Sequence, residues 1–269
     1  MSHVLTEQLA RRIEQSEIEA LKSRLTAIKE IEGNPMDVKI KKFGDATAFS
    51  VKNIPGPSFN TVKGISGNEV EYIDRILAFY DEREIPARFE ITPAHASTEL
   101  FGALSEKGYN QCGFHTALYG EVPNDFILNA ETDISISIRE FKQNEFDVFA
   151  DIYIEGFNMP SFLKDHVAHN NKVLHNNGHW TFYMASFKGE PAGLGVMFEY
   201  DGIGTLAASA TVPAFRNQGV HSALILKRLQ QAARHNCKLI VGQAMYGSVS
   251  QNNMERADMK VAYTKGIWA

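Results

Sequence analysis

Apolar residues at helical spacing open the chain. Between residues 4 and 32, leucine and isoleucine recur every three to five positions, with charged residues between them. This is the pattern of an amphipathic helix. Gly33-Asn34-Pro35 then ends the run, because glycine and proline interrupt helices. We therefore expect one long helix over 4–32.

Short alternating or apolar segments fill the rest of the first half. Alternation and apolar runs predict strands, and spacings of three to four predict helices. The expected strands are 38–43, 46–51, 58–65, 87–91 and 109–119, and the expected helices are 69–83 and 98–107.

The second half repeats this order of elements. Asp201-Gly202 is a two-residue hairpin signal, and a polar segment to about Gly178 is expected to be a solvated, mobile loop. The expected strands are 134–140, 180–187, 191–200, 203–211, 238–241 and 260–267, and the expected helices are 144–156, 219–235 and 251–257.

Two related halves therefore account for the length of 269 residues, which lies between one large domain and two small ones. The fold class is α/β with a mixed sheet, and each half is a mostly antiparallel sheet flanked by helices. A polar connection at 122–132 separates them, so we expect domains at 1–128 and 133–269.

Composition narrows the function classes. A net charge of −5 argues against nucleic acid as a partner. Two cysteines, Cys112 and Cys237, cannot form a disulfide framework or a four-cysteine zinc site. No segment reaches the ~18 apolar residues of a membrane span, and the charged N-terminus does not match a signal peptide. We expect a cytoplasmic protein without a membrane partner.

The most informative segment runs from Thr211 to Leu224. A strand ends in a turn with proline, and Arg216 and Gly219 then precede a helix with an apolar face. A helix start offers unpaired N–H groups and partial positive charge, and Gly219 lacks the Cβ that would keep an anion away. The segment predicts a phosphate or pyrophosphate site, although it is neither a P-loop nor a G-x-G-x-x-G turn.

This segment resembles the hallmark of the GNAT superfamily of acyl-CoA-dependent N-acetyltransferases, Arg/Gln-x-x-Gly-x-Gly/Ala. Arg216, Gly219 and His221 occupy its three positions, and the segment from Gly247 to Thr264 is similar to the family's closing helix and strand. The resemblance covers roughly 134–269. The first half resembles a degenerate copy, with Ser66-Gly67-Asn68 in place of the phosphate turn.

The resemblance implies acetyl-CoA as co-substrate, an amine as acceptor, direct transfer and no metal. Backbone groups of the strand end would face the pantetheine and acetyl group, the helix start would hold the pyrophosphate, and Asn253 would bond the CoA arm. The implied cofactor-binding residues are Ser209, Ala210, Thr211, Arg216, Asn217, Gln218, Gly219, Val220, His221, Ser222 and Asn253.

The sequence departs from the family at three places. His221 replaces a small residue, Asp258-Met259 replaces a Gly-Phe pair, and Met254 stands where many members have a tyrosine that protonates the thiolate. If His221 contacts the pyrophosphate as a cation, CoA affinity should weaken above about pH 6.5.

No residue is assigned to acid or base catalysis. Glu199 is a candidate base, although a strand carboxylate facing solvent is favoured, and Tyr246, Ser250 and Tyr263 are weak candidates for the acid. Cys237 is interpreted as a small core residue. Glu155 is interpreted as a surface charge at a helix end.

Four of nine histidines cluster at residues 166–179, namely His166, His169, His175 and His179. The spacing is open to a metal site, but Asp165 is the sole flanking ligand type, so the loop interpretation is favoured.

These observations predict an N-acetyltransferase of a small-molecule amine, in which the first half is a scaffold on the acceptor side. The alternative is a non-catalytic acyl-CoA-binding or regulatory module, and transfer of a longer acyl group is a third hypothesis. The oligomeric state stays open, a homodimer included.

Overall fold

The computed structural model describes residues 4–54, 56–122 and 135–269. Contacts divide the chain into two compact units. The first unit joins Val4–Ala117 to Val261–Ala269, and the second unit contains Leu118–Lys260. The expected boundary between residues 128 and 133 lies outside the described residues, so the division into domains 1–128 and 133–269 stays a prediction.

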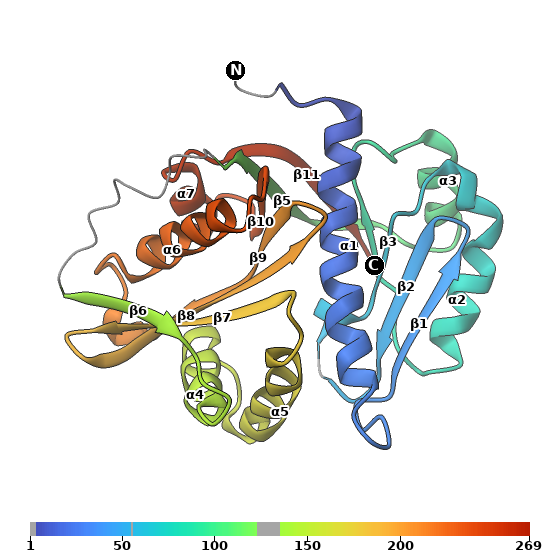
Figure 1. Ribbon diagram of the computed structural model, residues 1–269. Coiled ribbons are helices and arrows are strands. Elements are labelled where there is room, and N and C mark those ends of the chain that lie inside the picture. Colours follow the sequence, from blue (N-terminus) through green and yellow to red (C-terminus); the bar gives the residue numbers. More distant parts are fainter. Residues whose placement is uncertain (1–3, 55, 123–134) are drawn as a thin grey trace. The chain divides into compact units, whose positions relative to one another are not determined.

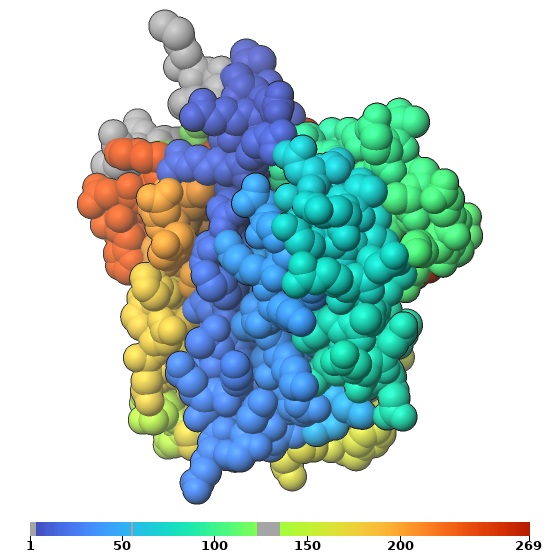
Figure 2. Space-filling view, turned by 90° about the vertical axis from the view of Figure 1, so that its right-hand side faces the viewer, coloured from blue at the N-terminus to red at the C-terminus, as the bar shows by residue number. Residues whose placement is uncertain are grey.

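Helices cover the sheet of the first unit, in which the strand order is β1-β2-β3-β4-β11-β5 (Figure 1). Figure 2 shows the surface of this unit, with α1 in dark blue and the β1–β2 hairpin in lighter blue. The elements are α1 (Glu7–Lys29), β1 (Val38–Phe43), β2 (Ala46–Val51), η1 (Pro57–Phe59), β3 (Thr61–Lys63), η2 (Gly67–Tyr72), α2 (Ile73–Asp81), β4 (Phe89–Ile91), α3 (Thr98–Glu106), the start of β5 (Gln111–Glu121) and most of β11 (Lys260–Trp268).

The second unit has the strand order β10-β9-β8-β7-β6, with the end of β5 beside β10. Its elements are β6 (Ile136–Glu140), α4 (Phe146–Phe157), η4 (Ser161–Leu163), α5 (Lys164–His175), β7 (Trp180–Phe187), β8 (Glu190–Tyr200), β9 (Ile203–Thr211), η5 (Pro213–Phe215), α6 (Val220–Arg234), β10 (Leu239–Met245) and α7 (Val249–Glu255).

The fold class predicted from the sequence is confirmed. In the second unit the pairs β6·β7, β7·β8 and β8·β9 are antiparallel, and β9·β10 is parallel. The expected Asp201-Gly202 turn is present, since both residues have positive φ angles, and Lys188 and Gly189 between β7 and β8 have positive φ angles too. Such angles match the twist of the flanking strands, which is why Asp-Gly and Lys-Gly turns fix this register.

Helices α4 and α6 cover opposite faces of β8 and β9. A Cβ added to Gly193 on β8 would meet Val220 of α6, whereas a Cβ added to Gly156 of α4 would meet Ala210 of β9. Ala210 pairs with Leu194, and neighbouring residues of a strand point to opposite faces. The α6 face therefore includes Gly193, and the α4 face includes Ala210 (Figure 1).

One sequence prediction is wrong. The segment expected to be a mobile polar loop contains the α5 helix, Lys164–His175. Ala168 and Leu174 of α5 are buried, and Asn171 donates its side-chain amide to the backbone oxygen of Val167 at 2.8 Å. The helix buries few apolar residues, so its polar composition concealed it.

The last expected strand is present, but from Val261 onwards it packs in the first unit. Gly266 of β11 pairs with Ile91 of β4 in antiparallel register. The Trp268 ring stacks on Phe101 at 5.0 Å between ring centroids. Aromatic burial of this kind contributes strongly to packing.

Among the described helices, none is long and apolar enough to cross a membrane.

Candidate acyl-CoA site

Strands β9 and β10 pair over only part of their length. Their parallel register joins Ile203–Leu206 to Leu239–Gly242, but β9 continues to Thr211 and β10 to Met245. A Cβ on Gly242 would come within 2.5 Å of the Met254 sulfur, so α7 packs directly against the point where the pairing ends. Beyond Leu206, one edge of β9 therefore lacks β10 as a partner.

A β-bulge precedes this edge. Val196 pairs with Ala208 and Met197 with Leu206, so Ala207 is an extra residue on β9. Bulges of this kind re-aim the residues that follow them.

The direction of the backbone groups after the bulge follows from one hydrogen bond. The Val212 amide donates to the Ala192 oxygen at 3.0 Å, and N–H groups alternate between the two edges of a strand. The amides of Ser209 and Thr211 therefore face away from β8, towards the edge that β10 has left. This edge offers N–H groups to a ligand.

The α6 helix begins beside the end of β9. Its N-cap is Gly219, at φ 78°, and no side chain caps the helix. Asn217 also has a positive φ of 62°, a region that asparagine and glycine enter most readily. The turn thus leaves the first amides of α6 for an anion.

Arg216 lies at the start of this turn, but its guanidinium reaches another element. Its Nη2 donates to the Gly156 carbonyl at 2.9 Å. Gly156 belongs to α4, and the close approach of its backbone to Ala210 and Thr211 leaves no room for a Cβ. Arg216 therefore connects the turn to the C-terminal end of α4.

A comparison with protein-family models adds an independent finding. Residues 146–253 match the acetyltransferase (GNAT) family. The family is therefore shown for this segment of the second unit. The resemblance predicted from Arg216, Gly219 and His221 is thereby confirmed.

Two solved structures have a similar fold. A GCN5-related N-acetyltransferase from Kribbella flavida is 13% identical, with 91% of this chain and 94% of that chain covered and a TM-score of 0.60. A tandem GNAT protein from the clavulanic acid biosynthesis pathway is 9% identical, with 95% of each chain covered and a TM-score of 0.62. At such identities the likeness establishes the fold. A comparison with curated proteins found no match.

Within the GNAT domain, His221 and Asn253 are already bonded to each other. Asn253 Nδ2 lies 2.9 Å from His221 Nδ1, and Arg256 Nη1 donates to Asn253 Oδ1 at 2.9 Å. Since an amide nitrogen donates, His221 Nδ1 accepts and the ring proton is on Nε2. Burial lowers the pKa of His221 to about 4, with the Arg228 charge as a smaller cause. His221 is therefore neutral at pH 7, contrary to a cationic role at the pyrophosphate.

Glu199 does not join these residues. It pairs with Gly204, seven positions along β9 from Thr211, or about 23 Å at 3.3 Å per residue. Its carboxylate lies 2.9 Å from His235 Nδ1 and 3.6 Å from the Cys237 sulfur. The structure places Glu199 in a local cluster at the far end of the strand.

The other weak candidates are scattered. Tyr246 follows β10 and is 71% exposed, whereas Tyr263 belongs to the first unit and is buried. Ser250 lies on α7, half-buried. Met254, at the position of the family's tyrosine, is buried and supplies no proton. Ser250 and Tyr246 lie closest in sequence to the point where β10 ends.

The cysteine interpretation agrees with the structure. Cys112 and Cys237 are both free. Burial raises the pKa of the Cys237 thiol to about 12, and the Glu199 charge acts in the same direction. A thiol in this state is a poor nucleophile at pH 7.

The histidine cluster yields no metal site. In the part of the chain that the structure describes, no three His, Cys, Asp or Glu side chains lie close enough together to hold an ion. His175 is instead hydrogen-bonded within the fold, since its Nε2 lies 3.1 Å from the backbone oxygen of Phe141.

The first unit fills the turn that corresponds to the α6 start. Glu69 Oε2 accepts from the Ser66 amide at 3.0 Å and from its hydroxyl at 2.7 Å. The other oxygen accepts from the Asp45 amide at 3.3 Å. The Ser66 hydroxyl oxygen in turn accepts from the Asn68 amide at 3.2 Å, so side chains of the chain itself bond amides at this helix start, as in a capping box.

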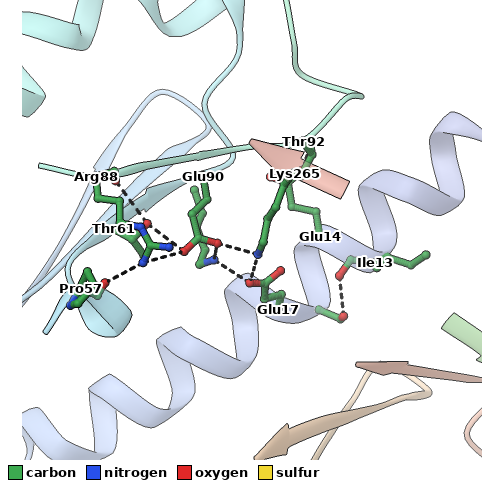
Figure 3. A network of polar contacts seen from close by, with 11 residues as sticks. Ile13, Glu14, Glu17, Pro57, Thr61, Arg88, Glu90, Thr92 and Lys265 are labelled. Carbon is green, nitrogen blue, oxygen red and sulfur yellow. Dashed lines mark hydrogen bonds and ion pairs between the residues drawn. The ribbon is translucent and has the colours of Figure 1, made fainter. Parts of the chain in front are cut away.

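Charged side chains of this unit meet between α1 and the strands β3, β4 and β11 (Figure 3). Lys63 Nζ lies 2.7 Å from Glu17 Oε1 and 2.5 Å from Glu90 Oε2, and Lys265 contacts the same two carboxylates. All four side chains are largely buried. No local sequence pattern predicts this cluster, because its members come from α1, β3, β4 and β11.

Proposed function

We propose that the protein is an N-acetyltransferase that transfers an acetyl group from acetyl-CoA to a primary amine of a small molecule. The observation that carries the proposal is the open edge of β9 beside the uncapped start of α6. One element offers amides to a thioester, and the other offers amides to a pyrophosphate. Membership of the GNAT family supports acyl transfer in general.

The residues would divide the cofactor between them. Amides from Asn217 to Ser222 would hold the pyrophosphate, where the α6 dipole favours negative charge. Backbone groups of Ser209, Ala210 and Thr211 would line the pantetheine and acetyl group. The structure gives Asn253 a different partner, His221, so we assign its contact with the CoA arm to a rotamer that breaks that bond.

The transfer needs no covalent enzyme intermediate. The amine, with an ordinary pKa near ~10.4, attacks after losing its proton to solvent or to a base. A nitrogen–carbon bond forms, the carbon–sulfur bond breaks, and its electron pair leaves on the CoA sulfur. The negative charge on the carbonyl oxygen would be stabilised by the outward amides of Ser209 and Thr211, an oxyanion-hole arrangement.

Two features support the second hypothesis, a non-catalytic acyl-CoA-binding module. Met254 is apolar and buried where an acid is expected, and Tyr246 is highly exposed. This hypothesis predicts binding without turnover, so the two are tested separately.

The first unit is proposed to be a degenerate GNAT-like unit that binds no CoA. Its support is the Glu69 carboxylate on the Ser66 amide and the ion pairs that Lys63 of β3 forms with Glu17 and Glu90.

Isothermal titration with acetyl-CoA tests the cofactor, and release of free thiol across a panel of primary amines tests the reaction. We expect binding, and thiol release that depends on one class of amine. Binding without release on any amine would favour the non-catalytic module. No binding at millimolar acetyl-CoA would overturn both hypotheses. Competition by longer acyl-CoA esters measures the acyl-chain preference.

A further inference from the structure

A buried arginine lies directly beneath the bulge of β9. Arg228 is on α6 and is 1% exposed. Its guanidinium donates to backbone oxygens of Val196 at 3.3 Å and Ala208 at 3.0 Å, and to Leu224 at 2.9 Å. Its Nη2 also donates to the Ser209 hydroxyl at 3.2 Å. The side chain therefore binds both strands at the point where their register shifts.

The charge of Arg228 has no carboxylate partner among the described residues. Burial lowers the pKa of Arg228 to about 10, which leaves it charged at pH 7, and Tyr183 is the group that acts on it in the opposite direction. Burying an isolated cation costs free energy because the cation loses its hydration, unless hydrogen bonds compensate for that loss. Carbonyl dipoles supply the compensation here.

The neighbouring sequence makes room for this arrangement. A Cβ added to Gly195 would lie 3.1 Å from Arg228 Nε and 3.2 Å from its Cζ. Gly195 pairs with Ser209, so the guanidinium lies close to the backbone beside the bulge. The small residue and the arginine fit each other.

The contact with Ala208 has a consequence on the other edge of β9. The Ala208 carbonyl and the Ser209 N–H belong to one peptide group. A charged donor on the carbonyl polarises that group and makes its N–H a stronger donor, since hydrogen bonds in series strengthen one another. The Ser209 N–H is one of the two amides that face the open edge.

We propose that Arg228 is a positioning residue for acyl transfer. It satisfies the carbonyls that the bulge exposes and strengthens the Ser209 N–H that polarises the thioester carbonyl. This inference rests on the proposed function. Arg228 touches neither cofactor nor acceptor, and its effect passes through the backbone of β9.

The test measures the carbonyl stretch of bound acetyl-CoA labelled with ¹³C at the carbonyl, by difference infrared spectroscopy. The variant Arg228→Lys keeps the charge and loses the planar fork, and Ser209→Ala removes one contact of Arg228. The matched control is Arg234→Lys, an exposed arginine on the same helix.

In the unaltered protein we expect the stretch to lie below its value in solution. Arg228→Lys should return it towards that value and slow thiol release about tenfold, less than the loss of a whole oxyanion donor. The KM for acetyl-CoA should change less than about threefold, because Asn217–Ser222 are untouched. Arg234→Lys should change none of these quantities, and Ser209→Ala should give a smaller shift than Arg228→Lys.

If Arg228→Lys has the same carbonyl stretch as the unaltered protein and normal turnover, this inference is overturned while the proposed function stands. The same is true if turnover falls solely in proportion to folded protein, as seen by circular dichroism. Absence of acetyl-CoA binding by the unaltered protein would instead remove the proposed function. If Arg228→Lys does not fold, the carbonyl stretch of acetyl-CoA bound to Ser209→Ala is the deciding measurement. A stretch equal to that in the unaltered protein contradicts the inference.

Discussion

At the scale of single residues, the side chains that look reactive in the sequence are bonded to other parts of the fold. His221 accepts from Asn253, Glu199 lies beside His235, and Arg216 reaches Gly156. The groups left for a ligand are main-chain amides, and these cannot be recognised from residue types in the sequence. This is why the sequence could predict the turn but not a catalytic acid or base.

The protonation of His221 gives a direct prediction. Its lowered pKa keeps it neutral above about pH 4, so it should not contribute a titrating charge to CoA binding. We expect the ratio of acetyl-CoA affinities of the unaltered protein and His221→Gln to be constant between pH 5.5 and 8. A ratio that rises as pH falls through about 6.5 would show that His221 binds the pyrophosphate as a cation.

The same shift affects stability. Because the folded pKa lies below the ordinary value of 6.5, unfolded chains bind more protons in the interval between them. The stabilisation of the fold that comes from this pKa shift of His221 is therefore complete above about pH 6.5 and is lost as pH falls towards about 4. Urea unfolding at pH 7 and pH 5 should show a smaller loss of unfolding free energy in His221→Gln than in the unaltered protein. An equal loss in both would contradict this assignment.

At the scale of elements, two backbone features form the site: the bulge at Ala207 and the glycine start of α6. The sequence predicted β9 at 203–211 and placed the α6 start within one residue, because alternation, the Asp201-Gly202 turn and Gly219 are strong local signals. The bulge has no such signal. The α5 helix was missed, because Asn170 and Asn171 occupy buried positions that usually hold apolar residues.

The glycine at the start of α6 can be tested against a matched glycine. Gly219 and Gly189 both have positive φ, 78° and 90°, and neither has neighbours that a Cβ would clash with. Replacement by alanine should cost each about 1 kcal/mol of stability from backbone strain. We expect Gly219→Ala to weaken acetyl-CoA binding about tenfold or more by moving the α6 amides, and Gly189→Ala to leave it unchanged. Equal effects of both on binding, by titration calorimetry, would contradict a phosphate site at Gly219.

At the scale of the whole molecule, the chain path is less simple than two consecutive halves. Residues from Val261 onwards belong to the first unit, where Lys265 contacts Glu17 and Glu90. Contacts across more than 240 residues of sequence leave no local pattern. The sequence therefore predicted the β11 strand, at 260–267, but gave no indication that it packs against α1 and β4.

The buried charge cluster predicts a large effect of Lys265→Met on stability. Removing one cation leaves two carboxylates to share Lys63, and breaking a buried pair costs about 3–5 kcal/mol. Lys39→Met, at an exposed position of β1, is the control and should change the unfolding free energy by less than about 0.5 kcal/mol. A similar result for the two variants in urea unfolding would show that the cluster contributes little.

Acid should weaken the same cluster. Lys265 and Lys63 hold the pKa of Glu90 well below its ordinary value of 4.5, against the effect of burial, and the pKa of Glu17 is lowered too. The stabilisation is therefore present above about pH 4.5 and is lost as pH falls further. Between pH 5 and pH 3, Lys265→Met should lose less unfolding free energy than the unaltered protein. A larger loss in the variant would contradict these pKa directions.

We propose that the open edge of β9 and the start of α6 together bind acetyl-CoA. The most direct measurement is a ¹⁵N–¹H NMR titration with CoA, followed at assigned backbone amides. We predict saturable shifts at Ser209, Thr211 and Gly219–Ser222, with the Ser66–Glu69 amides of the first unit unchanged. Shifts confined to Ser66–Glu69, or no saturable shift at any of these amides, would contradict the claim.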